Sequence, residues 1–258
     1  MKLIDRLNQF TPINVSEING FDFSDLKEKK FILSAKKLKN VLEDIKDDYY
    51  VLEIKGNKII KCTSEYYDTE DYKLYLAYHN GNGNRYLIKN NEIEGIKNNS
   101  IKIKFKSNKG EVSKVKQKTK NSDFGSAEIK EFLQENTPFN PDILKKMLKN
   151  SYYRIVLIHK RNKEKITIDL DLVLSNMQDR IKLPYLAIVE VKQEKLSLFS
   201  DFILSLRKFN IQKTSLSKYC IGVALLNKDV KKNKFKSKLL AISKINDKEP
   251  HPQQVFTA

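Results

Sequence analysis

The sequence predicts one α+β domain built on an antiparallel β-sheet, with flanking and C-terminal helices. The main observation is residues 101–106, Ile-Lys-Ile-Lys-Phe-Lys, where apolar and lysine side chains alternate with the period of a two-faced strand. A turn signal, Asn108-Lys109-Gly110, follows, and the alternation resumes through residues 112–116, which predicts a hairpin. About eight strand-like runs occur, mostly in hairpins, and this favours an antiparallel sheet over alternating β-α-β units.

The first half of the chain contains strands with one early helix. Residues 1–23 carry few regular signals and are expected to form a lead-in segment. Residues 29–33 form a strand-like run, and Ser34 stands where the N-cap of a helix through Ile45 belongs. Residues 49–55 and 59–67 flank a Gly56-Asn57 turn, which predicts a hairpin. Residues 85–91 predict the strand that precedes the lysine hairpin.

The second half combines one more hairpin with most of the helices. Ser126 is expected to cap a helix through Leu133, and Asn140-Pro141 to open another. The remaining elements are a hairpin of residues 154–159 and 165–170, a strand at 185–194, helices at 199–209, 218–226 and 236–245, and a mobile tail at 247–258.

Charge and composition bound the function. Lys and Arg number 49 against 32 Asp and Glu, a net charge of +17, which favours a polyanionic partner such as nucleic acid, an anionic membrane or a phosphate-rich molecule. Two distant cysteines, no apolar signal segment and no apolar run near the ~18 residues of a membrane span predict a cytoplasmic protein. Phosphate-loop and dinucleotide-binding signatures are absent, and the three histidines lack metal-ligand spacing.

Cationic side chains recur on single faces of successive strands. They are Lys89, Lys102, Lys104, Lys106, Lys114, Lys116, Arg154, Lys165 and Lys192. If the sheet closes into a barrel, these faces point inward, and because an unpaired buried charge is costly, the interior would be a wet tunnel for a polyanion. Glu190 shares a face with Lys192; it either forms an internal ion pair or holds Mg²⁺ or Mn²⁺ across phosphate oxygens.

The motifs in this order resemble the VTC domain of polyphosphate polymerases, within the triphosphate tunnel metalloenzyme (CYTH-like) superfamily, from about residue 30 to residue 245. The matching stretches are Tyr66-Tyr67-Asp68-Thr69, Tyr78-His79-Asn80-Gly81 with Asn84-Arg85-Tyr86, residues 104–110, Ile166-Thr167-Ile168-Asp169, Glu190-Val191-Lys192 and Ser217-Lys218-Tyr219-Cys220.

The resemblance implies a barrel-shaped tunnel that transfers the γ-phosphoryl group of ATP to a growing polyphosphate chain with Mn²⁺ or Mg²⁺. It implies catalytic roles for Lys89, Lys104, Arg154 and Lys165 and a metal-ligand role for Glu190. The predicted phosphate-binding residues are Lys30, Lys106, Lys114, Lys116, Lys192 and Lys218. Export of the product would require a membrane-protein partner.

Three positions depart from the family pattern. The R-x-R strand reads Lys89-Asn90-Asn91, the glutamate of E-x-K is Lys102, and the basic residue that opens the next strand is Glu111. Lysine lacks the two-pronged grip of arginine, and loss of one charge-stabilising donor costs on the order of 10²–10³ in rate elsewhere. The alternatives are therefore a polyphosphate- or inositol-phosphate-binding module with weakened turnover, or a triphosphate hydrolase.

Specific nucleic-acid binding is disfavoured because the aromatic residues have core spacing.

Overall fold

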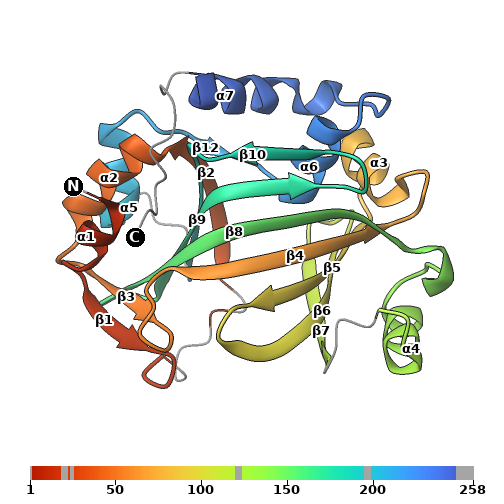
Figure 1. The fold of residues 1–258 in the computed structure, drawn as a ribbon, viewed down its shortest axis with the longest axis horizontal. Helices are drawn as coiled ribbons and strands as arrows, with labels where there is room; N and C mark the ends of the chain where they lie inside the picture. The colour runs from red at the N-terminus through yellow and green to blue at the C-terminus, as the bar shows by residue number, and fades with distance from the viewer. Residues whose placement is uncertain (1, 19–22, 24–25, 120–123, 195–198, 248–258) are drawn as a thin grey trace.

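The structure is a computed structural model, and it describes residues 2–18, 23, 26–119, 124–194 and 199–247. A large curved β-sheet forms its centre (Figure 1). The strands are β1 (Thr11–Asn14), β2 (Lys27–Ser34), β3 (Tyr49–Glu53), β4 (Ile60–Asp68), β5 (Arg85–Ile93), β6 (Ile96–Lys106), β7 (Val112–Thr119), β8 (Lys145–His159), β9 (Glu164–Ser175), β10 (Arg180–Leu183), β11 (Leu186–Gln193) and β12 (Lys213–Thr214).

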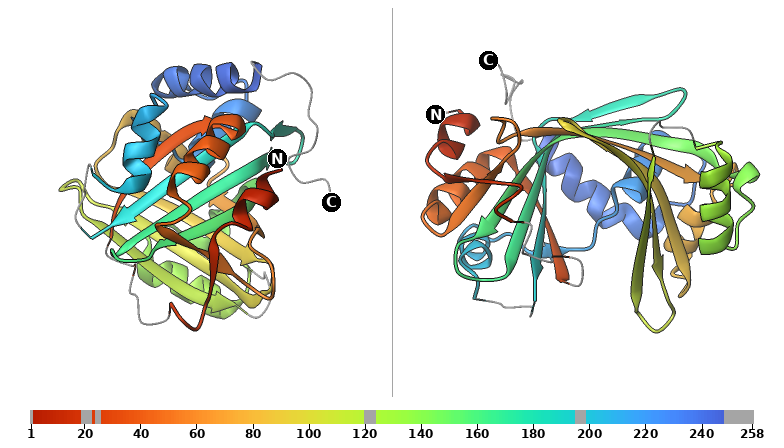
Figure 2. Two further views of the ribbon diagram at one scale, coloured as in Figure 1. Left: turned by 90° about the vertical axis from the view of Figure 1, so that its left-hand side faces the viewer. Right: turned by 90° about the horizontal axis from the view of Figure 1, so that it is seen from below.

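The main path of the sheet runs β12-β2-β11-β9-β8-β4-β5-β6-β7, and its neighbouring strands are antiparallel. Over the described residues this path is open, with β12 and β7 at its ends, and Figure 2 shows it curving into an arch. The α+β class and the antiparallel sheet are thus confirmed. Hydrogen bonding does not close the sheet into the predicted barrel, and the arch leaves one concave side.

Helices cover the outside and one end of the arch. They are α1 (Leu3–Leu7), α2 (Ala35–Ile45), α3 (Lys73–Asn80), α4 (Ala127–Asn136), α5 (Asp201–Lys208), α6 (Lys218–Leu226) and α7 (Lys236–Asp247), with single 3₁₀ turns η1 (Pro141–Ile143) and η2 (Asn233–Phe235). α1, α2 and α5 lie outside the β2–β11–β9 side, α4 lies outside the β5–β6–β7 side, and α3, α6 and α7 gather at one end (Figures 1 and 2).

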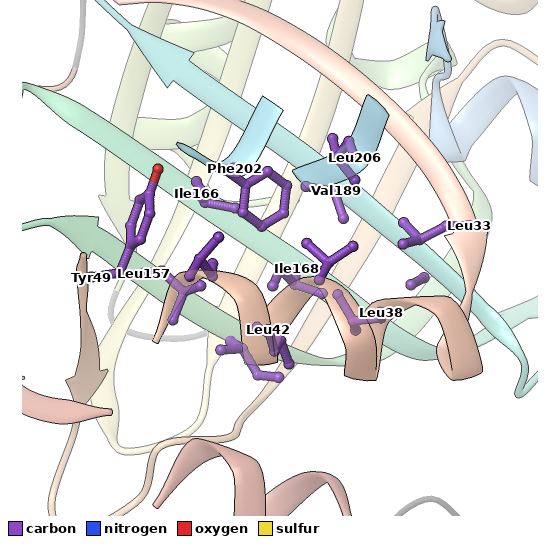
Figure 3. Packing of buried hydrophobic residues seen from close by; sticks show 14 of the residues in the cluster. Leu33, Leu38, Leu42, Tyr49, Leu157, Ile166, Ile168, Val189, Phe202 and Leu206 are labelled. Atoms are coloured by element: carbon purple, nitrogen blue, oxygen red, sulfur yellow. The ribbon is translucent and has the colours of Figure 1, made fainter. Parts of the chain in front are cut away.

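The largest core lies between the convex side of β2, β9 and β11 and the helices α2 and α5 (Figure 3). Ile166, Ile168 and Val189 from the strands meet Leu38 and Phe202 from the helices, and all are buried. This packing follows from alternation along the strands and helical spacing in α2. Because alternate residues on these strands fill the core, the residues between them face the concave side.

Local signals account for several elements. The Ser34 hydroxyl accepts a hydrogen bond from the Lys37 amide at 3.3 Å, as an N-cap should. The lysine hairpin is confirmed as β6–β7, and the second hairpin as β8–β9, with longer strands than predicted.

The hairpin predicted at Gly56-Asn57 is wrong. β3 and β4 both exist, but each pairs with a different part of β8: β3 with Leu157–His159 and β4 with Lys145–Arg154. A single bridge, Ile54 with Asn57, is the pairing recorded across the turn. The two strands therefore follow one another along a common long partner.

Other differences are smaller. The helix predicted at Asn140-Pro141 is the single turn η1, and the lead-in segment contains α1 and β1. Most of the predicted tail, residues 248–258, lies outside the described residues. Within the described part of the chain, every helix is too short or too polar to traverse a lipid bilayer.

Candidate functional site

Charged side chains converge on the concave side of the arch; we call this set the basic face. Its cations are Lys30 (β2), Lys89 (β5), Lys102 and Lys104 (β6), Arg154 (β8), Lys165 (β9), Lys192 (β11) and Lys218 (α6), and its acids are Glu28 (β2), Asp169 (β9) and Glu190 (β11). Strand register places Lys89 opposite Lys102 and Lys165 opposite Lys192. Like charges directly opposite one another destabilise a sheet, so the arrangement is costly without anions.

A β-bulge determines which residues of β9 belong to this face. Before the bulge, Ile166, Ile168 and Leu170 enter the convex core, so Asp169 faces the concave side. The register with β8 then shifts between Ser151 and Tyr153. After the shift the even-numbered residues Leu172 and Leu174 pack in the core that contains α6. The bulge thus places a charged stretch and an apolar stretch on the same side of one strand.

Glu28 and Glu190 share one lysine. The Lys30 ammonium lies 3.5 Å from a Glu28 carboxylate oxygen and 3.4 Å from one of Glu190. Glu28 also lies 3.4 Å from the Lys104 ammonium, and Glu190 lies 3.4 Å from that of Lys192. Burial would raise the pKa of Glu190, but the charges of Lys30 and Lys192 outweigh it and hold that pKa well below its usual range. Glu190 is therefore an ionised carboxylate at neutral pH.

Asp169 has a stronger set of partners. Its carboxylate accepts hydrogen bonds from the Arg154 guanidinium at 2.6 Å (Nε) and 2.8 Å (Nη2) and also from the Lys218 ammonium. Burial would raise the pKa of Asp169, but Arg154 and Lys218 lower it below its usual range. The Tyr152 ring packs against both cations, with its centroid 3.8 Å from Lys218 Nζ and 5.1 Å from Arg154 Cζ.

Lys89, Lys102 and Lys165 form no ion pair with any described carboxylate, although each is half-buried. Burial, followed by the charges of Lys102 and Lys218, lowers the pKa of Lys89 to about 7. Burial, followed by the charges of Lys192 and Arg154, lowers the pKa of Lys165 to about 8. These lysines lack the counter-ions that stabilise the other cations of the face.

The structure thus brings together eight of the eleven residues predicted for the site. The other three lie on the same side of the sheet, at the margin of the basic face. Lys106 is half-buried on β6, and Lys114 and Lys116 are exposed on the edge strand β7, directly opposite Lys104 and Lys102. Residues that depart from the family pattern also have definite places. Asn91 is buried and its amide oxygen accepts a hydrogen bond from Ser64 at 2.9 Å, whereas Glu111 is exposed beside the β6–β7 turn.

Glu28, Asp169 and Tyr152 were not assigned roles from the sequence. Glu28 could have been found, because it stands two positions before Lys30 and so shares its face of β2. Asp169 lies in a matched motif, but its partners depend on strand register. Tyr152 contacts Lys218 only because α6 covers this end of the sheet. The local sequence around either residue does not predict that contact.

Solved structures with a similar fold include the following two. A "putative adenylate cyclase" from Bacillus halodurans has 14% identity and a TM-score of 0.51, and the match covers 78% of this chain and 96% of that one. A "putative adenylyl cyclase" from Hippeastrum, described as having a dominant triphosphatase activity, has 10% identity and a TM-score of 0.50, with 76% of this chain and 94% of that one covered. At these identities the likeness shows the fold alone. No curated protein matches.

The model of the VTC domain family matches residues 25–227. The matched stretch runs from just before β2 to the end of α6 and contains every residue of the basic face. The resemblance found in the sequence motifs is therefore confirmed: this chain belongs to the VTC domain family.

Proposed function

We propose that the basic face binds triphosphate and polyphosphate, and that the protein transfers the γ-phosphoryl group of ATP to a growing polyphosphate chain. The observation that carries this proposal is the set of half-buried lysines without carboxylate partners among the described residues, Lys89, Lys102 and Lys165. Burying an unpaired charge is unfavourable, and phosphate oxygens would supply the missing counter-ions. Family membership supports the same assignment.

Phosphoryl transfer needs positioning and charge stabilisation more than covalent chemistry from the protein. Lys89 and Lys104 approach from one side of the arch, and Arg154 and Lys165 from the other. Together they would fix the phosphate chain and neutralise charge on the transferring group. Most of these groups are lysines, which bind phosphate as point charges without a planar fork.

Glu28 and Glu190 fit a divalent cation that arrives with the nucleotide. The described residues contain no cluster of three or more Asp, Glu, His or Cys side chains suited to a metal, so a site formed by protein groups alone is not indicated. Mg²⁺, however, is commonly held by one or two carboxylates together with substrate phosphates. A bound Mg²⁺ or Mn²⁺ would neutralise charge on the phosphate oxygens. Lys30, which now lies between the two carboxylates, would then be free to contact phosphate.

The direct test is to incubate the purified protein with ATP and either Mn²⁺ or Mg²⁺. Products are resolved by gel for polymer and by assay for free phosphate. Long polymer is the expected result. Free phosphate without polymer would replace the polymerase with a triphosphate hydrolase, and absence of both products would leave binding as the function.

A second candidate is a binding module that holds polyphosphate or an inositol phosphate with little turnover. Asn91 favours it, because a neutral, buried amide engaged with Ser64 stands where the family pattern has a cationic donor. Restoring the donor with Asn91→Arg should raise turnover by on the order of 10²-fold if this donor limits the rate. Asn91→Gln, which adds length without charge, is the control. Equal turnover in the arginine variant and the control would remove the argument from Asn91.

A further inference from the structure

The three acids of the basic face have unequal contacts. Glu28 and Glu190 touch lysines at 3.4–3.5 Å and can exchange them for other ligands. Asp169 is only 5% exposed, and both of its oxygens accept hydrogen bonds from the Arg154 fork, one of them also from Lys218. Two-pronged arginine–carboxylate pairs are among the strongest and most directional hydrogen bonds. Both oxygens of Asp169 are therefore occupied by hydrogen bonds from Arg154 and Lys218, and we expect them to exchange these partners less readily than Glu28 and Glu190.

The same two cations are held from a second direction by an aromatic ring. Tyr152 lies at 3.8 Å from Lys218 Nζ and 5.1 Å from Arg154 Cζ, measured to the ring centroid. Arg154 and Lys218 thus contact both a buried carboxylate and a ring, although they come from β8 and α6. Such contacts restrict the rotamers that long, flexible side chains otherwise sample.

Arg154 and Lys218 both keep N–H donors that these contacts do not occupy. A guanidinium has five N–H donors and an ammonium has three. Asp169 takes two donors of Arg154, Nε and Nη2, and one contact of Lys218. The remaining donors can bind phosphate oxygens while the contacts to Asp169 persist.

We propose that Asp169 is a positioning residue, which holds Arg154 and Lys218 in the orientation that binds phosphate oxygens. This inference deepens the proposed function and rests on it. Asp169 acts through its neighbours, and the carboxylates that would hold a cation are the more loosely paired Glu28 and Glu190.

Charge alone predicts the opposite effect of removing this carboxylate. Asp169→Asn would make a cationic face more positive by one charge, and simple attraction would then tighten binding of a polyanion. Loss of positioning would weaken binding in spite of the added charge. The sign of the change therefore separates the two roles.

The experiment measures binding of inorganic tripolyphosphate by calorimetry, with EDTA present so that metal binding does not contribute. We expect Asp169→Asn to weaken binding about tenfold, the loss associated with charged hydrogen bonds, and Asp169→Glu to recover part of it. Asp171→Asn is the matched control: it removes the same charge two residues along β9, where no contact with Arg154 or Lys218 is recorded. Asparagine also tolerates the left-handed backbone at this position, where φ is +50°.

Equal or tighter binding by a folded Asp169→Asn variant would overturn the proposal. If this variant does not fold, Arg154→Lys decides, because it keeps the charge and loses the fork that Asp169 orients. Positioning predicts a several-fold loss of affinity for Arg154→Lys, and unchanged affinity would contradict it. Absence of tripolyphosphate binding by the unmodified protein would instead refute the proposed function.

Discussion

The two sides of the arch differ in how the positive charge on their concave surface is compensated. The first wall, formed by β2, β11 and β9, carries all three acids of the basic face: Glu28, Glu190 and Asp169. The second wall, formed by β5, β6 and β7, presents lysines on its concave side, and no acid accompanies them among the described residues. The first wall can neutralise much of its charge internally. On the second wall Lys104 reaches Glu28 across the arch, but Lys89 and Lys102 have no carboxylate partner among the described residues and depend on ions from outside.

Packing on the convex side follows the same division. The first wall is covered by α2 and α5 over the largest core. The second wall has the smaller core under α4, and its edge strand leaves Val115, which pairs with the core residue Ile103, 37% exposed. The first wall is therefore the better-packed support, and we expect the second wall to gain more stability from a bound polyanion.

The largest expected effect tests the acid side of the comparison. Glu190→Ala should abolish metal-dependent turnover, with a loss on the order of 10²-fold or more, because it removes one of two carboxylates that would hold the cation. Product formation from ATP is measured across a range of Mn²⁺ and Mg²⁺ concentrations. Glu194→Ala is the control, since Glu194 is 67% exposed and lies 3.9 Å from Lys163. An unimpaired Glu190 variant would contradict the metal role.

The next effect tests the cationic wall. Lys89→Met should weaken tripolyphosphate binding about tenfold while it stabilises the unliganded protein by about 1 kcal/mol, because a half-buried charge without a carboxylate partner is removed. Calorimetry and thermal unfolding measure the two effects. Lys61→Met, on the exposed convex side of β4, should change neither property. A Lys89→Met variant that is less stable than the unmodified protein in the absence of tripolyphosphate would show that the charge of Lys89 is already compensated.

The pH dependence should separate stability from binding. Lys89 and Lys165 have pKa values lowered to about 7 and about 8, against 10.5 for a free lysine, so the unfolded chain binds more protons than the folded one between these values. The stability of the unliganded protein contributed by these groups should therefore rise from about pH 7 towards pH 10. Tripolyphosphate binding should weaken over the same range, because anions favour the protonated lysines. Each trend should be smaller in Lys89→Met, and identical trends would rule out Lys89 as their source.

Alternation made the lysine side of the site predictable. The strict pattern in residues 101–106 fixed a cationic face for Lys102 and Lys104 before any tertiary contact was known. The contacts of Asp169 were not predictable in this way, because they depend on a bulge between β8 and β9 and on the place of α6. Neither feature has a local sequence signal.

The error at Gly56-Asn57 has a related cause. The turn signal is real, and Gly56 adopts a left-handed backbone with φ +81°. Which strands pair, however, was decided by β8, which is long enough to accept β3 and β4 one after the other. The open path of the sheet is also a non-local outcome, since alternation is the same in an arch and in a barrel.

The smallest effect tests whether helix packing outside the first wall is energetically separate from binding at the basic face. Ser34→Ala removes the N-cap of α2, where the hydroxyl meets the Lys37 amide at 3.3 Å, and should cost about 1 kcal/mol of stability. A change of this size lowers the unfolding temperature by about 2–4 °C in a chain of this length. Ser34→Thr, which keeps a capping hydroxyl, should restore most of the loss.

Tripolyphosphate affinity should stay the same in Ser34→Ala, because α2 packs on the convex side of the first wall, away from the cations that would bind phosphate. A parallel loss of affinity would mean that helix packing sets the geometry of the basic face, and the first wall could then no longer be treated as an independent support.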